Sequence, residues 1–302
     1  MLQPILQTHG LTKKYKEFTA LNNVSLTLRQ GDIYGLVGRN GAGKTTFFKC
    51  VMGLAKPTGG TVAIDGKTSN LNAARRRMGF MINPSFFPYL DPRENLKYAC
   101  HVKGIQTRGE VERLLKLVGL SDVKKPFKSF SMGMKQRLGI AGALLGSPPV
   151  VVLDEPINGL DPQGIADIRA VIKSAQEQTG ATLIVSSHIL SELDLVATRF
   201  GFIEQGVLLK EITHKDLHDH TKKSLIIEVN DAQKAAAVLQ AGVGAAGTVT
   251  SDGRLILESH LNEPHQIARA LINGGIELYD LHRQETTLEE YFMRLIGGGQ
   301  DA

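Results

Sequence analysis

A glycine-rich segment has the residue types and spacing of a phosphate-binding loop. Residues 38–45 match G-x-x-x-x-G-K-[ST], between an apolar strand pattern and a helical pattern. Glycines let backbone N–H groups curl around a phosphate, Lys44 can reach the β- and γ-phosphates, and the Thr45 hydroxyl can ligate Mg²⁺. The residues expected to contact a nucleotide are Gly38, Arg39, Asn40, Gly41, Ala42, Gly43, Lys44, Thr45 and Thr46. The alternative is a glycine-rich turn that matches the spacing by chance.

An acidic pair follows a second apolar run. Val150–Leu153 ends in Asp154 and Glu155. After a phosphate loop, an Asp at the tip of a buried strand holds Mg²⁺, so we expect Asp154 to share the metal with Thr45. Glu155 points to the other side of the strand and could orient a water for attack on the γ-phosphate. Without the loop, two such acids would indicate only a solvated turn.

These side chains require a sheet that gathers strand ends. Ile33–Val37, Val150–Leu153 and Thr182–Ser186 read as buried strands, and 165–178 between the last two has helical spacing. Strand, helix and strand in that order predict a right-handed crossover and a mostly parallel sheet. Ligands of such sheets bind beyond the carboxyl ends of the strands, where the loop and the acidic pair fall.

Charge divides the 302 residues into two parts. Residues 1–221 carry 28 Lys and Arg against 19 Asp and Glu, whereas 222–302 carry 7 against 11. This reversal predicts two domains, 1–221 and 222–302. The basic first domain fits an anionic partner, which charge alone does not identify as nucleotide, nucleic acid or membrane.

The second domain has a small α+β pattern. Strands are expected at 224–230, 276–279 and in a hairpin over 248–258 that turns at Asp252-Gly253, with helices at 232–241, 264–273 and 288–296. Thr287 and Glu290 have capping-box spacing. The order β-α-β-β-α-β with an added helix is typical of the split ferredoxin-like arrangement.

Composition points to a soluble, cytosolic protein. Hydrophobic residues make up 42% of the chain, yet no uncharged run has the roughly 20 predominantly apolar residues of a membrane-spanning helix. We expect no signal segment after Met1, and two cysteines, Cys50 and Cys100, favour a reduced compartment.

Further motifs resemble those of ABC-transporter ATPases over residues 1–220. The signature motif of that family is resembled by Phe130-Ser131-Met132-Gly133-Met134. Its D-loop is resembled by Asn158-Gly159-Leu160-Asp161, and its switch histidine by His188, which follows Ser186-Ser187. The resemblance implies an α/β fold of the P-loop NTPase ABC-ATPase type, a mostly parallel sheet with a helical subdomain, plus the small C-terminal α+β domain. It also implies a Mg-dependent ATPase with ATP and Mg²⁺ as cofactors.

The resemblance assigns roles to single residues. Lys44, Glu155 and His188 would be catalytic, with Glu155 activating water and His188 contacting the γ-phosphate. Tyr15 would stack on adenine, although it could instead be a packed strand aromatic. In a head-to-tail dimer, Ser131 and Gly133 would face the γ-phosphate bound by the second subunit, with Asp161 at the seam; the other reading of Ser131 is an ordinary helix cap.

One departure concerns the metal. Where the family has a Gln or Glu that touches Mg²⁺ and the attacking water, the sequence has Asn83 followed by Pro84. Asn83 is a candidate Mg²⁺ ligand with a shorter stem, and the alternative is a simple turn pair. Met132 and Met134 also replace the commoner Gly and Gln, but Ser131 and Gly133 are kept.

The same resemblance implies partners. The segment after Asn83 and a C-terminal helix resemble exporters of the bacitracin and lantibiotic resistance and multidrug group. We therefore expect a peripheral subunit on the cytoplasmic face of the membrane that docks on integral-membrane permease subunits, pairs with a second ATPase subunit in a homodimer, and binds no nucleic acid. Two alternatives remain: a soluble ABC ATPase acting on ribosomes or DNA, and a C-terminal domain that binds a regulator. Residues 75–77 are three arginines, which we expect on a solvated helix face; the alternative is contact with a lipid headgroup.

Overall fold

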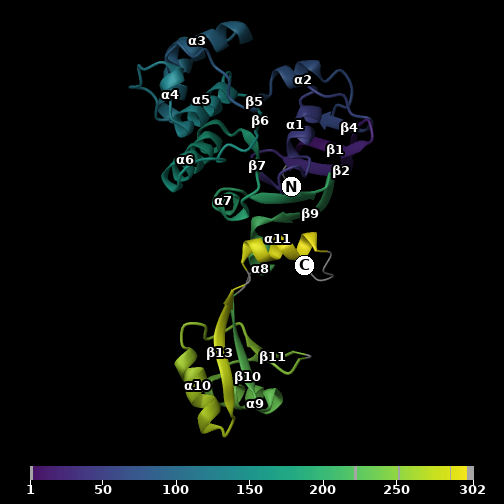
Figure 1. Cartoon of the computed structure of the whole chain (residues 1–302), viewed down its shortest axis with the longest axis vertical. Coiled ribbons are helices and arrows are strands. Elements are labelled where there is room, and N and C mark those ends of the chain that lie inside the picture. The colour runs from purple at the N-terminus through teal and green to yellow at the C-terminus, as the bar shows by residue number, and fades with distance from the viewer. Residues whose placement is uncertain (1–2, 221–222, 251, 286, 298–302) are drawn as a thin grey trace. The chain divides into compact units, whose positions relative to one another are not determined.

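Two compact units, Met1–His214 and Lys215–Ala302, make up the chain (Figure 1). The computed structural model describes residues 3–220, 223–250, 252–285 and 287–297. Each unit has a hydrophobic core of its own. The boundary predicted from the sequence, between residues 221 and 222, lies outside the described residues.

A six-stranded sheet forms the centre of the first unit. Its strand order is β5-β6-β7-β3-β8-β9, and all neighbours are parallel except β8 and β9. The strands are β3 (Ile33–Val37), β5 (Gly79–Met81), β6 (Val150–Leu153), β7 (Thr182–Ser187), β8 (Arg199–Glu204) and β9 (Val207–Thr213). Every residue of β3, β6 and β7 is buried, as expected for strands covered on both faces. The mostly parallel sheet predicted from the sequence is confirmed.

A second, antiparallel sheet was not predicted. It has the order β2-β1-β4 and consists of β1 (Pro4–Tyr15), β2 (Phe18–Arg29) and β4 (Gly59–Ile64). One hydrophobic core contains Leu26 and Leu28 of β2, Val152 of β6, and Phe47 and Phe48 of α1 (Lys44–Val51). The helix that follows the phosphate loop is therefore packed within a core that both sheets share.

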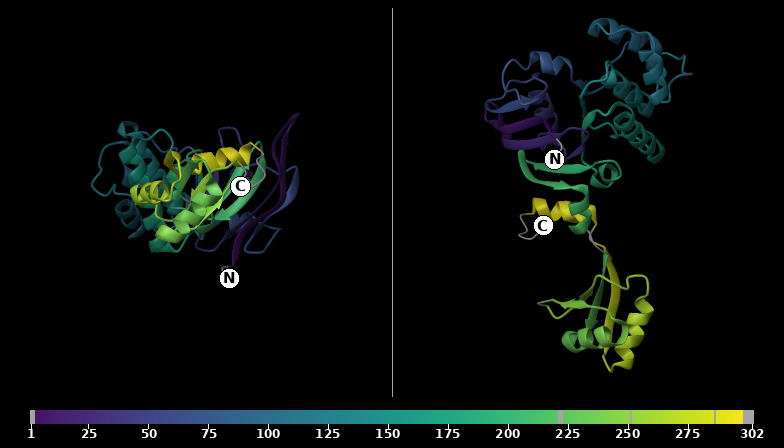
Figure 2. Two further views of the ribbon diagram at one scale, coloured as in Figure 1. Left: turned by 90° about the horizontal axis from the view of Figure 1, so that it is seen from below. Right: turned by 180° about the vertical axis from the view of Figure 1, so that it is seen from behind.

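A group of helices completes the first unit. They are α2 (Asn72–Arg76), α3 (Pro92–Lys103), α4 (Glu110–Leu117), the 3₁₀ turn η1 (Phe127–Ser129), α5 (Met132–Leu144), α6 (Pro162–Thr179) and α7 (Leu190–Asp194). Figures 1 and 2 show α3, α4 and α5 on one side of β6 and β7 and the antiparallel sheet on the other. Asp91 and Glu94 form a capping box at the start of α3, with Pro92 in its first turn. These helices form the expected helical subdomain.

The second unit has the predicted β-α-β-β-α-β order and added helix. After α8 (His214–His220), its elements are β10 (Lys223–Val229), α9 (Ala232–Val243), β11 (Gly247–Val249), β12 (Leu255–Leu257), α10 (Pro264–Asn273), β13 (Leu278–Glu285) and α11 (Leu288–Ile296). The sheet order is β11-β12-β10-β13, all antiparallel. Thr287 and Glu290 form the predicted capping box. The strand expected at 276–279 instead runs from Leu278 to Glu285. The sequence did not indicate its second half, because this edge strand is rich in polar and charged residues and has little apolar pattern there.

Candidate nucleotide-binding site

The loop between β3 and α1 adopts a conformation that requires glycine. Gly41 and Gly43 have φ angles of 84° and 108°. A Cβ at Gly43 would lie 2.7 Å from the Ala20 carbonyl oxygen, and one at Gly38 would collide with the Ile203 carbonyl oxygen. The backbone therefore curls tightly over the first turn of α1, whose free N–H groups favour an anion.

Lys44 is held at the centre of this loop. Its side chain is almost fully buried, and its Nζ donates hydrogen bonds to the carbonyl oxygens of Gly38, at 2.5 Å, and Arg39, at 3.1 Å. The same nitrogen lies 3.0 Å from Oε1 of Glu155. The loop thus fixes a cation beside the carboxylate that ends β6.

A hollow of about 300 Å³ opens at the loop. Its lining includes residues 40–46, Glu155, Ala20 and Phe18, of which Phe18 is 63% exposed. A hollow bounded by backbone N–H groups, a buried lysine and one exposed aromatic ring suits a nucleoside triphosphate. Tyr15 does not line it, although Tyr15 and Phe18 are partners across the β1–β2 hairpin. The Tyr15 ring carries Lys13 Nζ at 4.7 Å from its centroid.

The carboxyl ends of β3, β6 and β7 bring together the oxygen groups predicted to hold a metal. The Thr45 hydroxyl donates a 2.7 Å hydrogen bond to Oδ2 of Asp154. Ser186 of β7, which lies between β6 and β3, donates a 2.7 Å hydrogen bond to Oδ1 of the same carboxylate. Hydroxyl and carboxylate oxygens are the ligands that Mg²⁺ prefers, so this donor set fits that ion.

Glu155 is turned toward the loop by its backbone. Its φ angle of 50° lies in the left-handed region, and its N–H donates a 2.8 Å hydrogen bond to the Ser186 hydroxyl. The Oε2 atom lies 3.0 Å from Nδ1 of His188. One carboxylate therefore contacts both Lys44 and His188, which the sequence places 144 residues apart.

Asn83 follows β5, next to the acidic strand. The Asp154 N–H donates a hydrogen bond to the carbonyl oxygen of Met81. Asn83 follows Met81 by two residues, so its turn comes shortly after the residue that pairs with Asp154. Asn83 is exposed and has a φ angle of 48°. Among the described residues, no hydrogen bond joins its side chain to Thr45 or Asp154.

The remaining predicted site residues gather elsewhere. Ser131 is the N-cap of α5, where its hydroxyl accepts a 3.3 Å hydrogen bond from Met134 N–H. Asp161 is the N-cap of α6 and accepts from Gly164 N–H at 2.9 Å. Ser131, Gly133 and Asp161 line a hollow of about 370 Å³ that shares no lining residue with the one at the phosphate loop.

Comparison with known proteins decides the family. The profile of the ABC transporter family matches residues 21–158. The bacitracin transport ATP-binding protein of Enterococcus faecalis is 37% identical, over 99% of this chain and 98% of that protein. Its counterpart in Bacillus licheniformis is 38% identical, over 99% of both chains. The chain belongs to the ABC transporter family. The lantibiotic transport ATP-binding protein of Streptococcus pyogenes is 39% identical over 68% of this ABC subunit and 90% of that protein.

Solved structures agree with this assignment. A dimeric ATP-binding cassette in a post-hydrolysis state, bound to ADP and Pi, superposes with a TM-score of 0.63 and 27% identity. It covers 70% of this ABC subunit and 99% of that chain. The ATP-binding subunit of another ABC transporter gives a TM-score of 0.62 and 29% identity, over 71% and 92% of the two chains. The protein is accordingly an ATP-binding subunit of an ABC transporter.

Sequence reasoning missed two side chains of this ABC subunit. Ser186 hydrogen-bonds to both Asp154 and the Glu155 N–H, yet it was noted only as part of the run before His188. Phe18 lines the hollow at the loop, and its signal was a second aromatic three residues after Tyr15. Both contacts depend on strand pairing, which the motif spacing does not contain.

Proposed function

We propose that this chain is the Mg-dependent ATPase subunit of an exporter and powers transport through separate permease subunits. The observation that carries the proposal is the ion pair of Lys44 with Glu155, formed beside the hydrogen bond between Thr45 and Asp154. A phosphate-binding amine, two oxygen groups suited to Mg²⁺ and a carboxylate suited to water activation meet at one sheet edge. Phosphoryl transfer needs little more than this positioning and charge neutralisation.

Each side chain then has one task. Lys44 and the loop amides hold the phosphates, and Thr45 and Asp154 hold Mg²⁺, with Asn83 as a further ligand. The metal, when bound, neutralises charge that develops on the phosphate oxygens. Glu155 accepts a proton from the attacking water, and His188 contacts the γ-phosphate from the end of β7. Phe18 and Tyr15 supply aromatic surface for the adenine.

We further propose a head-to-tail dimer that closes on two ATP molecules. The hollow lined by Ser131 and Gly133 is separate from the one at Lys44, so a single subunit offers two half-sites. In the dimer, Ser131 and Gly133 of one subunit face the nucleotide on the loop of the other, with Asp161 at the seam. The dimeric cassette that superposes on 70% of this chain supports dimerisation.

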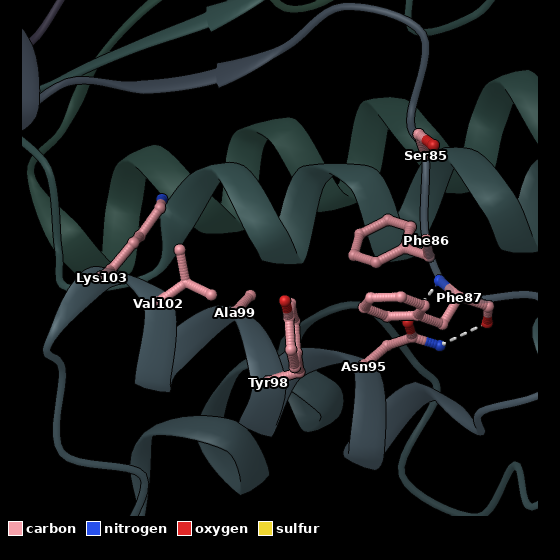
Figure 3. A pocket seen from close by; sticks show the side chains of 8 residues that line it. All are labelled: Ser85, Phe86, Phe87, Asn95, Tyr98, Ala99, Val102 and Lys103. Atoms are coloured by element: carbon pink, nitrogen blue, oxygen red, sulfur yellow. Dashed lines mark hydrogen bonds between the residues drawn. The ribbon is translucent and has the colours of Figure 1, made fainter.

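Permease subunits would dock on an apolar groove of the helical subdomain (Figure 3). None of the described helices combines the length and apolar composition needed to cross a bilayer. The groove has a volume of about 420 Å³, and Phe86 and Phe87 line it opposite Tyr98 and Val102 of α3. Tyr98 and Val102, one turn apart on α3, are 51% and 70% exposed, so two large apolar side chains of this helix face solvent. A subunit docked in this way is a peripheral protein on the cytoplasmic face of the membrane.

The groove has a rigid wall. Asn95, which is buried, accepts a 2.8 Å hydrogen bond from Phe87 N–H and donates to the carbonyl oxygens of Phe87, Leu90 and Asp91. The Phe87 and Tyr98 rings meet edge to face at 4.7 Å between centroids. The segment after Asn83 is thus fastened to α3, and a preformed surface loses little entropy when a partner binds.

The relatives favour a transporter that exports a peptide antibiotic. Two of them are named for bacitracin transport and one for lantibiotic transport. All three are transport proteins, which speaks against the soluble ATPase acting on ribosomes or DNA.

Affinity purification of the tagged chain from detergent-solubilised membranes of its host tests this function. We expect a stoichiometric polytopic membrane protein, identified by mass spectrometry. Recovery of the chain only with ribosomes or nucleic acid would overturn the proposal.

A further inference from the structure

The arginines at 75–77 do not form one solvated face, contrary to expectation. The Arg75 side chain turns back into the first unit, where Nε donates a 2.9 Å hydrogen bond to the carbonyl oxygen of Val51. Burial lowers the pKa of the Arg75 guanidinium. Arg76 and Arg77 are exposed, and within the described part of the chain neither has a carboxylate at ion-pair distance. Arg75 is therefore structural, whereas the next two arginines carry uncompensated charge.

Arg76, Arg77 and Lys103 line one hollow of about 230 Å³. It lies where the ends of α2 and α3 meet the turn after α5. Lys103 Nζ donates a 3.3 Å hydrogen bond to the carbonyl oxygen of Gly142, and burial lowers the pKa of its ammonium group. Because three cationic side chains line this one hollow, an anion placed among them would be stabilised. We call this feature the cationic hollow.

The carboxylate of Glu110, which is bonded to the lining residue Gly146, already has partners. Glu110 accepts a 2.9 Å hydrogen bond from Gly146 N–H and forms a 3.0 Å ion pair with Arg113. Although burial alone would raise its pKa, the Arg113 and Gly146 hydrogen bonds hold the pKa of Glu110 below its usual value. Glu110 is therefore ionised and paired with Arg113 at neutral pH. Arg76 and Arg77 remain available for an anion from outside the chain.

The cationic hollow and the apolar groove share one lining residue. Lys103 lines both, and Figure 3 shows it on α3 one residue beyond Val102 at the end of the groove. A segment lying along α3 would meet aromatic surface at Phe87 and Tyr98 and then positive charge at Lys103. The two features therefore adjoin at Lys103, with apolar side chains in one and cationic side chains in the other.

We propose that the permease segment that docks in the groove carries an acidic side chain, which Arg76, Arg77 and Lys103 bind in the cationic hollow. The proposal rests on the proposed function, because it names the chemistry of the partner that function requires. Guanidinium groups bind a carboxylate through two parallel hydrogen bonds, which fixes orientation as well as charge. Apolar contact in the groove supplies affinity, and the ion pair sets the register of the segment along α3.

The test combines cross-linking with charge reversal in the full chain. A photo-cross-linking amino acid in place of Val102, in the tagged chain expressed in its host, captures the segment that lies in the groove, and mass spectrometry gives its sequence. The charge-reversed variant is Arg76→Glu/Arg77→Glu. Its matched control is Lys116→Glu/Lys173→Glu, which changes two exposed lysines away from the hollow and alters net charge equally.

We expect the captured peptide to belong to a polytopic membrane protein and to contain Asp or Glu. Arg76→Glu/Arg77→Glu should lower recovery of that protein by about tenfold or more, with the ATPase rate of the isolated chain unchanged and the control at wild-type recovery. Exchange of the captured acidic residue for Lys should restore recovery with the charge-reversed variant.

Three results would overturn the inference while the proposed function stands: a captured peptide without an acidic residue, normal recovery with Arg76→Glu/Arg77→Glu, or no rescue by the permease exchange. Binding to phosphatidylglycerol vesicles that this variant loses, with normal permease recovery, would instead assign the cationic hollow to a lipid headgroup. Failure of the proposed function looks different, because no membrane protein would then be captured by the wild-type chain.

Discussion

The ammonium nitrogen of Lys44 lies 3.0 Å from Oε1 of Glu155. The other oxygen of this carboxylate lies 3.0 Å from Nδ1 of His188, so Glu155 is fixed between the phosphate loop and the end of β7. A carboxylate held in this way can accept a proton from a water beside the γ-phosphate.

Glu155→Gln should therefore bind ATP and hydrolyse it far more slowly. The amide keeps the size of the side chain but is not a base, and loss of a general base typically costs about 10²–10⁴ in rate. Single-turnover hydrolysis and nucleotide binding, measured separately, check this. Glu177→Gln, at an exposed position of α6, is the matched control and should behave like the wild type. Near-wild-type turnover of Glu155→Gln would contradict the general-base role.

Ser186→Ala should lower the affinity for Mg²⁺, or the Mg²⁺-dependent ATPase rate, without removing nucleotide binding. The hydroxyl orients Asp154 through a 2.7 Å hydrogen bond and accepts the Glu155 N–H at 2.8 Å. Loss of a group that orients a metal ligand typically lowers metal affinity or activity by about 10–100-fold. The measurement is the ATPase rate against Mg²⁺ concentration.

Ser187→Ala is the control for that change. Ser187 is equally buried and adjacent, and its hydroxyl accepts the Ile189 N–H at 3.0 Å. Within the described part of the chain it forms no hydrogen bond with Asp154 or Glu155. It should leave the Mg²⁺ dependence at the wild-type value. Identical Mg²⁺ curves for Ser186→Ala and the wild type would show that Asp154 needs no such support.

Site residues that belong to one local motif were predictable from the sequence. Contacts that depend on which strands pair in the sheet were not. The Gly38–Thr45 loop has one geometry because its glycines and the following helix leave few alternatives, so its spacing alone located it. Ser186 reaches Asp154 only because β7 lies between β6 and β3, a strand order that no local pattern records. Phe18 likewise depends on the pairing of β1 and β2.

The antiparallel sheet and the split arginine run show the same limit. β1 and β2 are partly exposed at their outer positions, so their apolar signal is weaker than that of β3, all of whose residues are buried. Residues 75–77 are identical in type, and only the nearby carbonyl oxygens of Cys50 and Val51 distinguish Arg75 from its neighbours. In the second unit, α10 and α11 were predicted to the residue, because proline, glycine and a capping box mark their ends.

Asn83→Gly should separate a ligand role of Asn83 from a turn role. The φ angle of 48° is one that glycine adopts without cost, so the backbone turn is kept while the amide is removed. If the amide contacts Mg²⁺ in the working enzyme, the half-saturating Mg²⁺ concentration should rise by about tenfold. If Asn83→Gly leaves the ATPase rate and transport unchanged, Asn83 serves only to form the backbone turn and is not a Mg²⁺ ligand.

Tyr34→Phe should destabilise the first unit in a pH-dependent way. The buried Tyr34 hydroxyl donates a 2.8 Å hydrogen bond to Oε1 of Glu211, and a hydrogen bond to a charged group contributes about 1.5–3 kcal/mol. Burial, reinforced by Glu211, raises the pKa of Tyr34 well above its ordinary value. The unfolded chain therefore releases this proton first, near pH 10, and the contribution of Tyr34 is complete below that pH and declines above it.

The free energy of unfolding in urea between pH 8 and pH 11 tests this. At pH 8 the variant should be less stable by about the energy of the hydrogen bond. Above about pH 10 the wild type should lose stability with rising pH faster than the variant, so that the two curves converge. Tyr89→Phe, at an exposed ring, should follow the wild-type curve throughout. Parallel curves for Tyr34→Phe and the wild type would mean that Tyr34 ionises alike in the folded and unfolded chains.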